Sequence, residues 1–136
     1  MRDDNCIFCK LANGDIPTNT IYEDEDFRVI LDNSPATKGH ALILPKQHYA
    51  NLFEIEDEIL GKAAGLAKKI IIHEKEVLGC DGYNVLQNNG EAAGQTVFHF
   101  HMHLIPRYAD EKGIIDWDHK EFSDNELKKI CSDMKM

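Results

Sequence analysis

The stretch FHFHMHLIP, residues 98–106, places a histidine at every second position with apolar residues between. Strict alternation is typical of a β-strand, whose successive side chains point to opposite faces. We therefore predict that His99, His101 and His103 share one open face of a strand, about 6.6–7 Å apart along it. The other face is predicted to pack on the core through Phe98, Phe100, Met102 and Leu104.

Three interpretations of this histidine row are open. The first is an exposed polar face. The second is a metal site, since histidines two apart on a strand can share one zinc. The third is a catalytic row that meets phosphate. Imidazole titrates near neutral pH, acts as nucleophile or proton carrier, and donates two hydrogen bonds when protonated. The preceding loop, QNNGEAAGQT, favours the third interpretation because its glycines and neutral donors suit an oxyanion. The donors are Asn88, Asn89, Gly94, Gln95 and Thr96.

Hydropathy patterns elsewhere predict four further strands and one long helix. Apolar runs at residues 20–23, 27–31, 40–45 and 83–87 read as strands, the first two joined by an acidic turn. A helical period predicts one long helix that stops near Gly79; its apolar positions are Ile55, Ile59, Ala63, Leu66, Ile70 and Val77. Shorter helices are expected over residues 10–15 and 123–134, the latter with Ser123 and Glu126 as a capping box. Because strands and helices do not alternate, the predicted class is α+β with an antiparallel five-stranded sheet.

Length and composition indicate one domain spanning residues 1–136. The net charge of −9 argues against broad contact with nucleic acid or anionic membrane. The start of the chain lacks the apolar core of a signal peptide, and no apolar run approaches the roughly 20 residues that span a bilayer. We therefore expect a cytoplasmic protein, in which the four cysteines form no disulfide framework.

Cys6 and Cys9 form a CxxC pair, the spacing of a metal knuckle or of a redox motif. The redox interpretation is disfavoured because it needs a preceding strand, and only five residues precede Cys6. A zinc ion would need two further ligands, and we expect His48, just past a strand, and His99 at the end of the histidine row. His40, His73 and His119 have no partner visible in the sequence and are expected to be solvated or capped.

The segment from His99 to Ile105 matches the pattern His-φ-His-φ-His-φ-φ, where φ is apolar. With the upstream Gly94-Gln95-Thr96 it resembles the histidine triad family, in the bacterial-type branch of purine nucleotide phosphoramidases and nucleotide hydrolases. The resemblance covers roughly residues 6–108, and the tail at 109–136 has no assigned role. A third-position histidine suits this branch better than the uridylyltransferase relatives, which have glutamine there.

The resemblance implies that His101 attacks the α-phosphorus of a purine nucleoside monophosphate bonded to an amine, acyl or phosphate group. A nucleotidyl-histidine would form and water would release the nucleotide. It implies a catalytic set of His99, His101, His103 and Thr96. It implies contacts with the nucleotide from Ile7, Phe8, Leu11, Ile30, Leu31, Asp32, Asn33, Asn88, Gly94, Gln95, Thr96, His101 and His103.

The resemblance further implies a structural Cys2His2 zinc held by Cys6, Cys9, His48 and His99, and a homodimer. Two other functions stay open. A dinucleoside polyphosphate hydrolase would use the same nucleophile with a larger leaving group. A zinc-stabilised nucleotide-binding or partner-binding module would have little catalysis.

Overall fold

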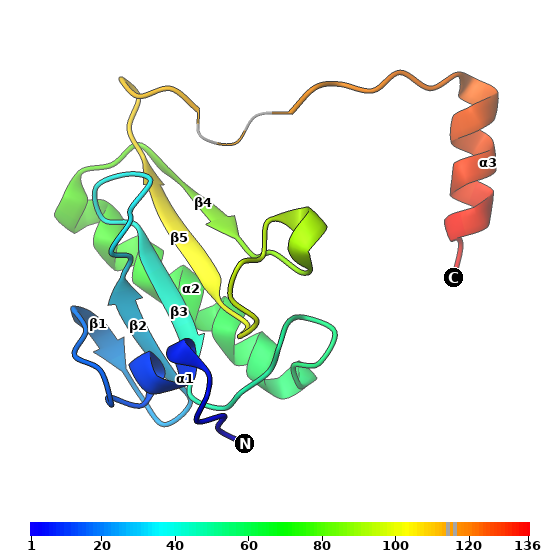
Figure 1. The fold of residues 1–136 in the computed structure, drawn as a ribbon. Helices are drawn as coiled ribbons and strands as arrows, with labels where there is room; N and C mark the ends of the chain where they lie inside the picture. The colour runs from blue at the N-terminus through cyan, green and yellow to red at the C-terminus, as the bar shows by residue number, and fades with distance from the viewer. Residues whose placement is uncertain (114, 116) are drawn as a thin grey trace.

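The computed structural model describes residues 1–113, 115 and 117–136. Five antiparallel strands form one sheet in the order β1-β2-β3-β5-β4 (Figure 1). The strands are β1 (Thr20–Glu23), β2 (Phe27–Leu31), β3 (Ala41–Pro45), β4 (Gly82–Leu86) and β5 (Met102–Arg107). The helices are α1 (Ile7–Ala12), α2 (Asp57–Leu78) and α3 (Asp124–Met134), with a short 3-10 turn η1 (Glu91–Ala93). The predicted α+β class and the predicted sheet are confirmed.

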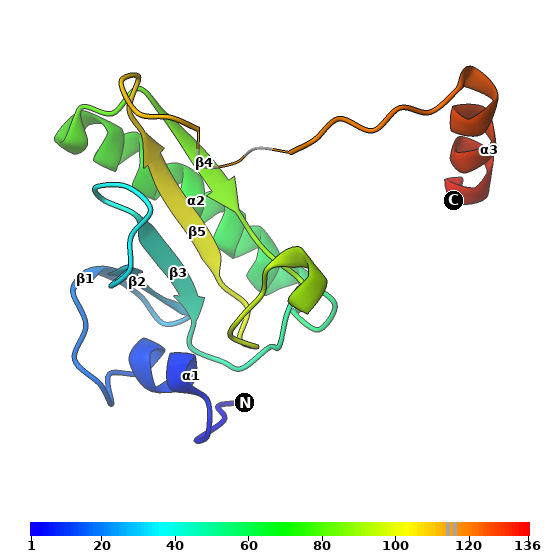
Figure 2. The ribbon, with the colours of Figure 1, turned by 45° about the horizontal axis from the view of Figure 1, so that its top comes forward.

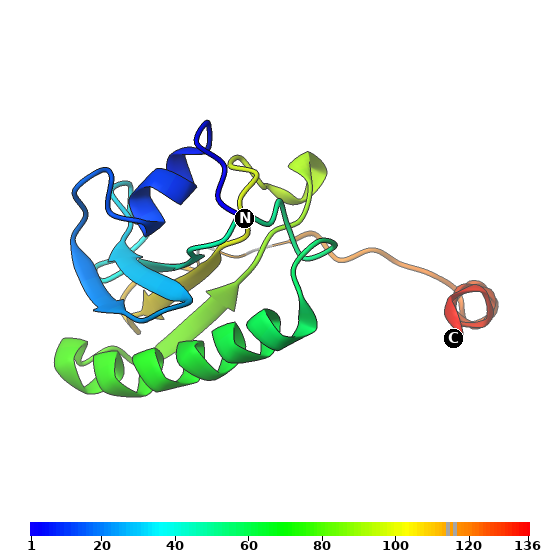
Figure 3. The same ribbon diagram turned by 90° about the horizontal axis from the view of Figure 1, so that it is seen from below.

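The long helix α2 covers one face of the sheet, and α1 covers part of the other (Figure 3). Asp57 and Glu58 lie in the first turn of α2, where the helix dipole favours negative charge, and Gly79 ends it with a left-handed φ of 66°. The expected stop is confirmed. Two of the predicted apolar positions do not belong to the buried face of this helix. Ile55 lies before its first residue, and Val77 lies within it but is 65% exposed.

Alternation along the strands divides the core into two layers. On the α2 side, Val29, Ile43 and Leu104 belong to the main apolar cluster. On the α1 side, Ile30 and Leu42 pack with Leu44 and Ala12 under the short helix. Both faces of β3 are covered, so that every residue of this strand is buried. The α1 face of the sheet is therefore where a short helix meets the histidine end of β5.

One of the two predicted short helices is shifted. The first helix runs over Ile7–Ala12 rather than residues 10–15, because Cys6 caps it: the Cys6 sulfur accepts from the backbone N–H of Cys9. The last helix begins as predicted, since Ser123 and Glu126 form a reciprocal capping box. Figures 1 and 2 show α3 standing away from the sheet at the end of an extended segment. Among the described residues, no helix is both long and apolar enough to cross a membrane.

The prediction of one continuous histidine strand is wrong. β5 begins at Met102, so that His99 and His101 precede it and only His103 lies within it. β3 pairs with β5 over Met102, His103 and Leu104 alone. Phe98, expected in the core, is 49% exposed, whereas His99 is completely buried.

Candidate active site and metal centre

His101 is held in one tautomer by the backbone just before it. Its Nδ1 lies 2.7 Å from the carbonyl oxygen of His99, which can only accept, so that Nδ1 carries the proton. The other ring nitrogen, Nε2, therefore keeps its lone pair. The ring lines a cavity on the α1 face of the sheet, and the edge-on ring of Phe8 lies 4.9 Å away between centroids. Burial lowers the pKa of His101, which favours the neutral, nucleophilic form.

His103 is oriented by a histidine that lies 63 residues away in the sequence. The backbone N–H of Ala36 donates to Nδ1 of His40 at 2.9 Å, so that the proton of neutral His40 is on Nε2. That Nε2 lies 2.9 Å from Nδ1 of His103 and 3.6 Å from a carboxylate oxygen of Asp32. His103 then accepts at Nδ1 and keeps its own N–H on Nε2. The cavity therefore contains one imidazole with a lone pair and one with a donor.

The prediction that His40 is solvated or capped missed this position. His40 is only 6% exposed, and burial lowers its pKa against the opposing effect of Asp32. Burial is also the main cause that lowers the pKa of His103 to about 4. Both imidazoles are therefore neutral at pH 7. No local pattern signals His40, because its partner is brought to it by the pairing of β3 with β5.

These rings open into a cavity of about 570 Å³ on the α1 face of the sheet. Of the residues predicted to contact a nucleotide, the cavity is lined by Phe8, Leu11, Ile30, Asp32, Asn33, Asn88, Gly94, Thr96, His101 and His103. The lining also includes residues that the sequence did not indicate: Ser34, Ala36, His40, Leu42, Leu86, Ile105 and Ile115. The lining combines apolar side chains with hydroxyl, amide and carboxylate groups, which is typical of small-molecule sites.

Three of the expected nucleotide contacts lie outside this lining. Ile7 and Leu31 are 47% and 39% exposed and do not line the cavity. Gln95 is 2% exposed, and its side chain braces the loop instead: its amide donates to the carbonyls of Ala50 and Val97 at 2.7 and 3.0 Å. Its oxygen also accepts from the backbone N–H of Gly90 at 2.9 Å. Gln95 therefore fixes the shape of the loop that carries Gly94 and Thr96.

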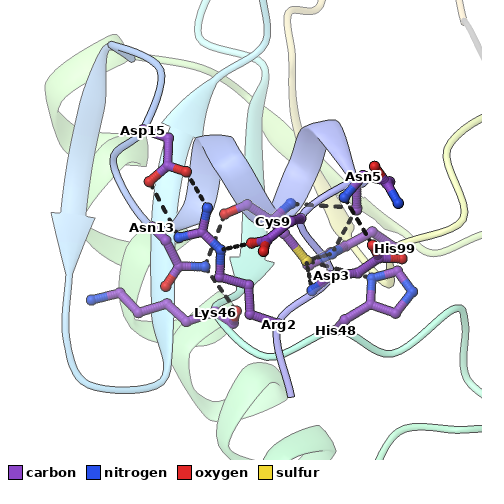
Figure 4. Close-up of polar contacts among 11 residues, drawn as sticks. Arg2, Asp3, Asn5, Cys9, Asn13, Asp15, Lys46, His48 and His99 are labelled. Carbon is purple, nitrogen blue, oxygen red and sulfur yellow. Dashed lines mark hydrogen bonds and ion pairs between the residues drawn. The ribbon is translucent and has the colours of Figure 1, made fainter.

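The other expected cluster is assembled beside this cavity. Side-chain donor atoms of Cys6, Cys9, His48 and His99 all lie within 4.8 Å of one another. Nδ1 of His99 lies 3.4 Å from both sulfurs, and Nδ1 of His48 lies 3.5 Å from the Cys9 sulfur. Figure 4 shows the Cys9 sulfur beside the rings of His48 and His99. The four residues come from the N-terminal segment, the end of β3 and the approach to β5.

These distances fit a tetrahedral zinc ion. Bonds of about 2.3 Å to sulfur and about 2.05 Å to nitrogen at the tetrahedral angle place the two ligand atoms roughly 3.6 Å apart. The surroundings fit as well: Nε2 of His99 lies 2.8 Å from the carbonyl of Pro45, which leaves Nδ1 to face the sulfurs. Backbone N–H groups of Asp3 and Cys9 donate to the two sulfurs at 3.4 Å, as they would to thiolates. The cluster can bind a metal.

Polar contacts hold the N-terminal segment in place around this cluster. The side-chain amide of Asn13 donates to the carbonyl of Cys9 at 2.8 Å and to that of Lys46 at 3.0 Å (Figure 4). Arg2 forms an ion pair with Asp15. These contacts join α1 to the end of β3, so that the metal cluster and the cavity share one wall.

Residues 13–110 match the HIT domain family, and this chain belongs to it. The adenosine 5'-monophosphoramidase hnt1 of Schizosaccharomyces pombe is 40% identical over 93% of this chain and 92% of its own length. The crystal structure of SMU.412c from Streptococcus mutans is 39% identical, covers 97% of this chain and 84% of that one, and has a TM-score of 0.90.

A zinc-bound histidine triad family protein from Mycobacterium smegmatis is 35% identical, with 94% and 96% of the two chains covered and a TM-score of 0.76. The resemblance predicted from the motif is therefore confirmed, together with the fold that it implied.

Proposed function

We propose that this chain hydrolyses the bond between the α-phosphate of a purine nucleoside monophosphate and an amine, acyl or phosphate leaving group. The observation that carries the proposal is the fixed tautomer of His101, whose Nδ1–H is bound to the His99 carbonyl at 2.7 Å. An imidazole held in this way presents a lone pair to the cavity at neutral pH. The name of the S. pombe relative, an adenosine monophosphoramidase, supports a phosphoramidate as the first substrate to test.

The reaction proceeds in two displacements. Nε2 of His101 attacks phosphorus, and the bond to the leaving group breaks with its electron pair. The leaving group takes its proton from solvent water as it departs, while the Nε2–H of His103 donates a hydrogen bond to it. A second water then attacks the same phosphorus and loses its proton to solvent, the P–N bond to His101 breaks with its electron pair returning to Nε2, and the nucleoside monophosphate is released. Dividing the hydrolysis in this way replaces one difficult step with two easier ones.

The remaining cavity residues have separate roles in this proposal. Phe8, Leu11 and Ile30 form the apolar wall for the base, and Asp32 accepts hydrogen bonds from the ribose hydroxyls. Asn88, Gly94, Thr96 and Asn33 offer amide, backbone and hydroxyl groups around the phosphate and ribose. Donors that are already positioned stabilise charge that develops on the phosphoryl oxygens.

The metal in this proposal is zinc and its role is structural. Four protein ligands leave no open position, and a ligated His99 is neutral and fixed, so that it supports the neighbouring His101 rather than acting as an acid. A zinc ion would hold α1, and with it Phe8, against the active strand. The zinc-bound relative supports the choice of metal. A homodimer, which the family resemblance implies, is part of the same proposal.

Turnover of an adenosine phosphoramidate tests the activity, with a diadenosine polyphosphate as the competing substrate class. We expect release of AMP from the phosphoramidate and an acid-labile nucleotidyl-protein adduct after rapid quenching. His101→Asn should abolish both while still binding AMP, because the asparagine cannot form the adduct. His73→Asn, on the exposed side of α2, is the matched control and should behave as the unmodified protein.

Persistent turnover in His101→Asn would overturn the mechanism. Faster cleavage of the dinucleotide would assign the chain to the polyphosphate hydrolases. Binding of AMP without any turnover in the unmodified protein would support a binding module instead.

A further inference from the structure

The two cysteines of the metal cluster differ in how they meet the solvent. Cys6 is half-buried and lines a second hollow of about 470 Å³, together with His48 and Phe98. Cys9 is completely buried and does not line that hollow. A small polar molecule that enters the hollow therefore meets the sulfur of Cys6 before it meets that of Cys9.

The backbone holds the two sulfurs close enough to bond with each other. Cys6 is the N-cap of α1, and its carbonyl accepts from the backbone N–H of Lys10, so that Cys6 already lies on the path of the helix. Residues three apart on such a path have Cα atoms roughly 5 Å apart, and a disulfide spans roughly 4.4–6.8 Å between Cα atoms. Both sulfurs lie 3.4 Å from the same nitrogen, Nδ1 of His99. A bond between them therefore needs rotation of two side chains rather than a new backbone path.

Both sulfurs also have the surroundings of thiolates, the reactive form of cysteine. The backbone N–H of Asp3 donates to the Cys9 sulfur and that of Cys9 to the Cys6 sulfur, each at 3.4 Å. A metal ion in the cluster would keep both sulfurs deprotonated. The other two cysteines lack this setting: Cys80 is buried, and Cys131 is exposed on α3, where only a few per cent of an ordinary thiol is ionised at pH 7.

We propose that Cys6 and Cys9 are a reversible oxidation site for a peroxide, at which a disulfide replaces the metal. The Cys6 sulfur attacks one oxygen of hydrogen peroxide, so that an S–O bond forms and the O–O bond breaks. The departing hydroxide takes a proton from solvent and becomes water. The Cys9 sulfur then attacks the Cys6 sulfur, the S–S bond forms, and the S–O bond breaks to release a second hydroxide, which is also protonated. The two sulfurs together give the two electrons that reduce the peroxide.

The oxidation has a consequence for the neighbouring cavity. A disulfide no longer offers thiolate ligands, and His48 and His99 alone are too few for a zinc ion, so that the metal is released. Phe8 lies between the two cysteines on α1, and its ring packs edge-on against that of His101. A change at the cysteine pair therefore reaches the ring of His101 through Phe8. This inference does not depend on the proposed hydrolysis, because each of these changes can be measured without a substrate.

Mass spectrometry of the zinc-loaded full chain after treatment with hydrogen peroxide tests the site. Trypsin cuts after Arg2 and Lys10 and releases both cysteines in one peptide, which becomes lighter by two hydrogen atoms when the disulfide forms. We expect this peptide to be oxidised at least about tenfold faster than Cys131, because its sulfurs are thiolates. A chromophoric chelator should detect about one zinc ion released per disulfide. Dithiothreitol with added zinc should restore the thiols and the metal.

Three outcomes of this measurement would overturn the proposal. They are faster oxidation of Cys131, a sulfinic acid on Cys6 without a disulfide, and retention of zinc after the disulfide has formed. Cys9→Ser removes the second attack, so that Cys6 should be trapped by dimedone as a sulfenic acid, whereas Cys131→Ser is the control and should form the disulfide normally. Circular dichroism checks that Cys9→Ser folds, and the measurement on the unmodified chain decides the proposal in either case.

NMR of the histidine rings tests the connection to the cavity. Oxidation should shift the ring-proton signals of His101, because the ring of Phe8 moves relative to it. The signals of His73, which is exposed on α2, should keep their positions. Phe8→Leu removes the aromatic ring and should reduce the shift at His101. An unchanged His101 signal in the oxidised chain would show that α1 stays in place and would overturn this part of the proposal.

Discussion

Nε2 of His40 and Nδ1 of His103 lie 2.9 Å apart, and the first of these nitrogens carries the shared proton. The reason is a second hydrogen bond: the backbone N–H of Ala36 donates to Nδ1 of His40, so that the proton of neutral His40 is on Nε2. A donor in the main chain thus sets the tautomer of two successive imidazoles. The result is an N–H on the cavity side of His103, where a phosphoryl oxygen would need it.

Removal of His40 should therefore lower activity through His103. In His40→Ala, Nδ1 of His103 loses its donor and both tautomers are populated, so that we expect kcat for a phosphoramidate to fall by about tenfold or more. His40→Gln places an amide N–H near the original position of Nε2 and should recover part of the loss. Steady-state kinetics of both variants, with circular dichroism to confirm folding, make the comparison. Equal loss in the two variants would show that only packing is affected.

The neutral state of His103 predicts a loss of stability in acid. Its pKa is lowered to about 4, whereas an unfolded histidine titrates near 6.5, so that the unfolded chain binds the proton first. The stability from the neutral form is fully present above about pH 6.5 and is lost as the pH falls toward 4. We expect this histidine to contribute on the order of 1 kcal/mol after solvent screening.

Urea unfolding at pH 7 and at pH 4.5 measures this contribution. The unmodified protein should lose more free energy of unfolding between the two values than His103→Asn, while His73→Asn should behave as the unmodified protein. Carboxylates that titrate in the same range affect all three proteins equally. Identical pH dependence in His103→Asn and the unmodified chain would contradict the assignment.

Much of the fold could be predicted because its signals are local. The helical period of α2, the capping box at Ser123 and the alternation in the strands each depend on neighbours in the sequence. The start of β5 does not: the backbone N–H of Phe100 donates to the carbonyl of Tyr49 at 2.7 Å and draws the chain out of the sheet. The alternating sequence pattern does not reveal this hydrogen bond. His99 was therefore predicted to lie on an open face, whereas it is buried under α1.

The candidate site divides in the same way. The metal cluster could be predicted because a CxxC spacing limits its ligands and two histidines flank strands that must be adjacent. His40 could not, because a histidine without a local motif gives no sign that a residue 63 positions away will bond to it. Ile7 and Leu31 lie outside the cavity lining for a related reason: an apolar residue on a short helix or at a strand end can face the cavity or the solvent, and packing decides which.

Zinc removal should loosen the wall that the metal cluster shares with the cavity. We expect about one zinc per chain in the unmodified protein and far less in Cys6→Ser, because the ion loses a thiolate. Free zinc at 100 times its Kd would stabilise the fold by roughly 2.7 kcal/mol, and chelation should remove that amount. KM should rise more than kcat falls, because Phe8 lies on α1 between the two cysteine ligands, Cys6 and Cys9.

Metal analysis by mass spectrometry and thermal unfolding with and without chelator measure these effects. Cys131→Ser is the matched control, since that thiol is exposed on α3 and far from the cluster. It should retain zinc. An undiminished zinc content in Cys6→Ser would remove the proposed site.

Two glycines are predicted to respond in opposite ways to the same substitution. Gly39 has a φ of +92° just before β3, and an added Cβ would lie 2.5 Å from a methyl group of Leu78. Gly39→Ala should cost about 1–3 kcal/mol, because the backbone conformation is strained for alanine even after Leu78 moves. Gly61, exposed on α2, has nothing within 4 Å of such a Cβ. Gly61→Ala should stabilise the protein by roughly 0.5–1 kcal/mol, because alanine loses less backbone entropy in a helix.

Urea unfolding of the two variants decides this pair. Because His40 follows Gly39 directly, Gly39→Ala should also lower kcat, whereas Gly61→Ala, on the far side of the sheet, should leave it unchanged. Gly39→Ser, with its own Cβ, should repeat the loss, which would separate backbone strain from any particular property of alanine. A Gly39→Ala protein of normal stability would show that the loop before β3 adopts another conformation in solution, and the orientation of His40 would have to be derived anew.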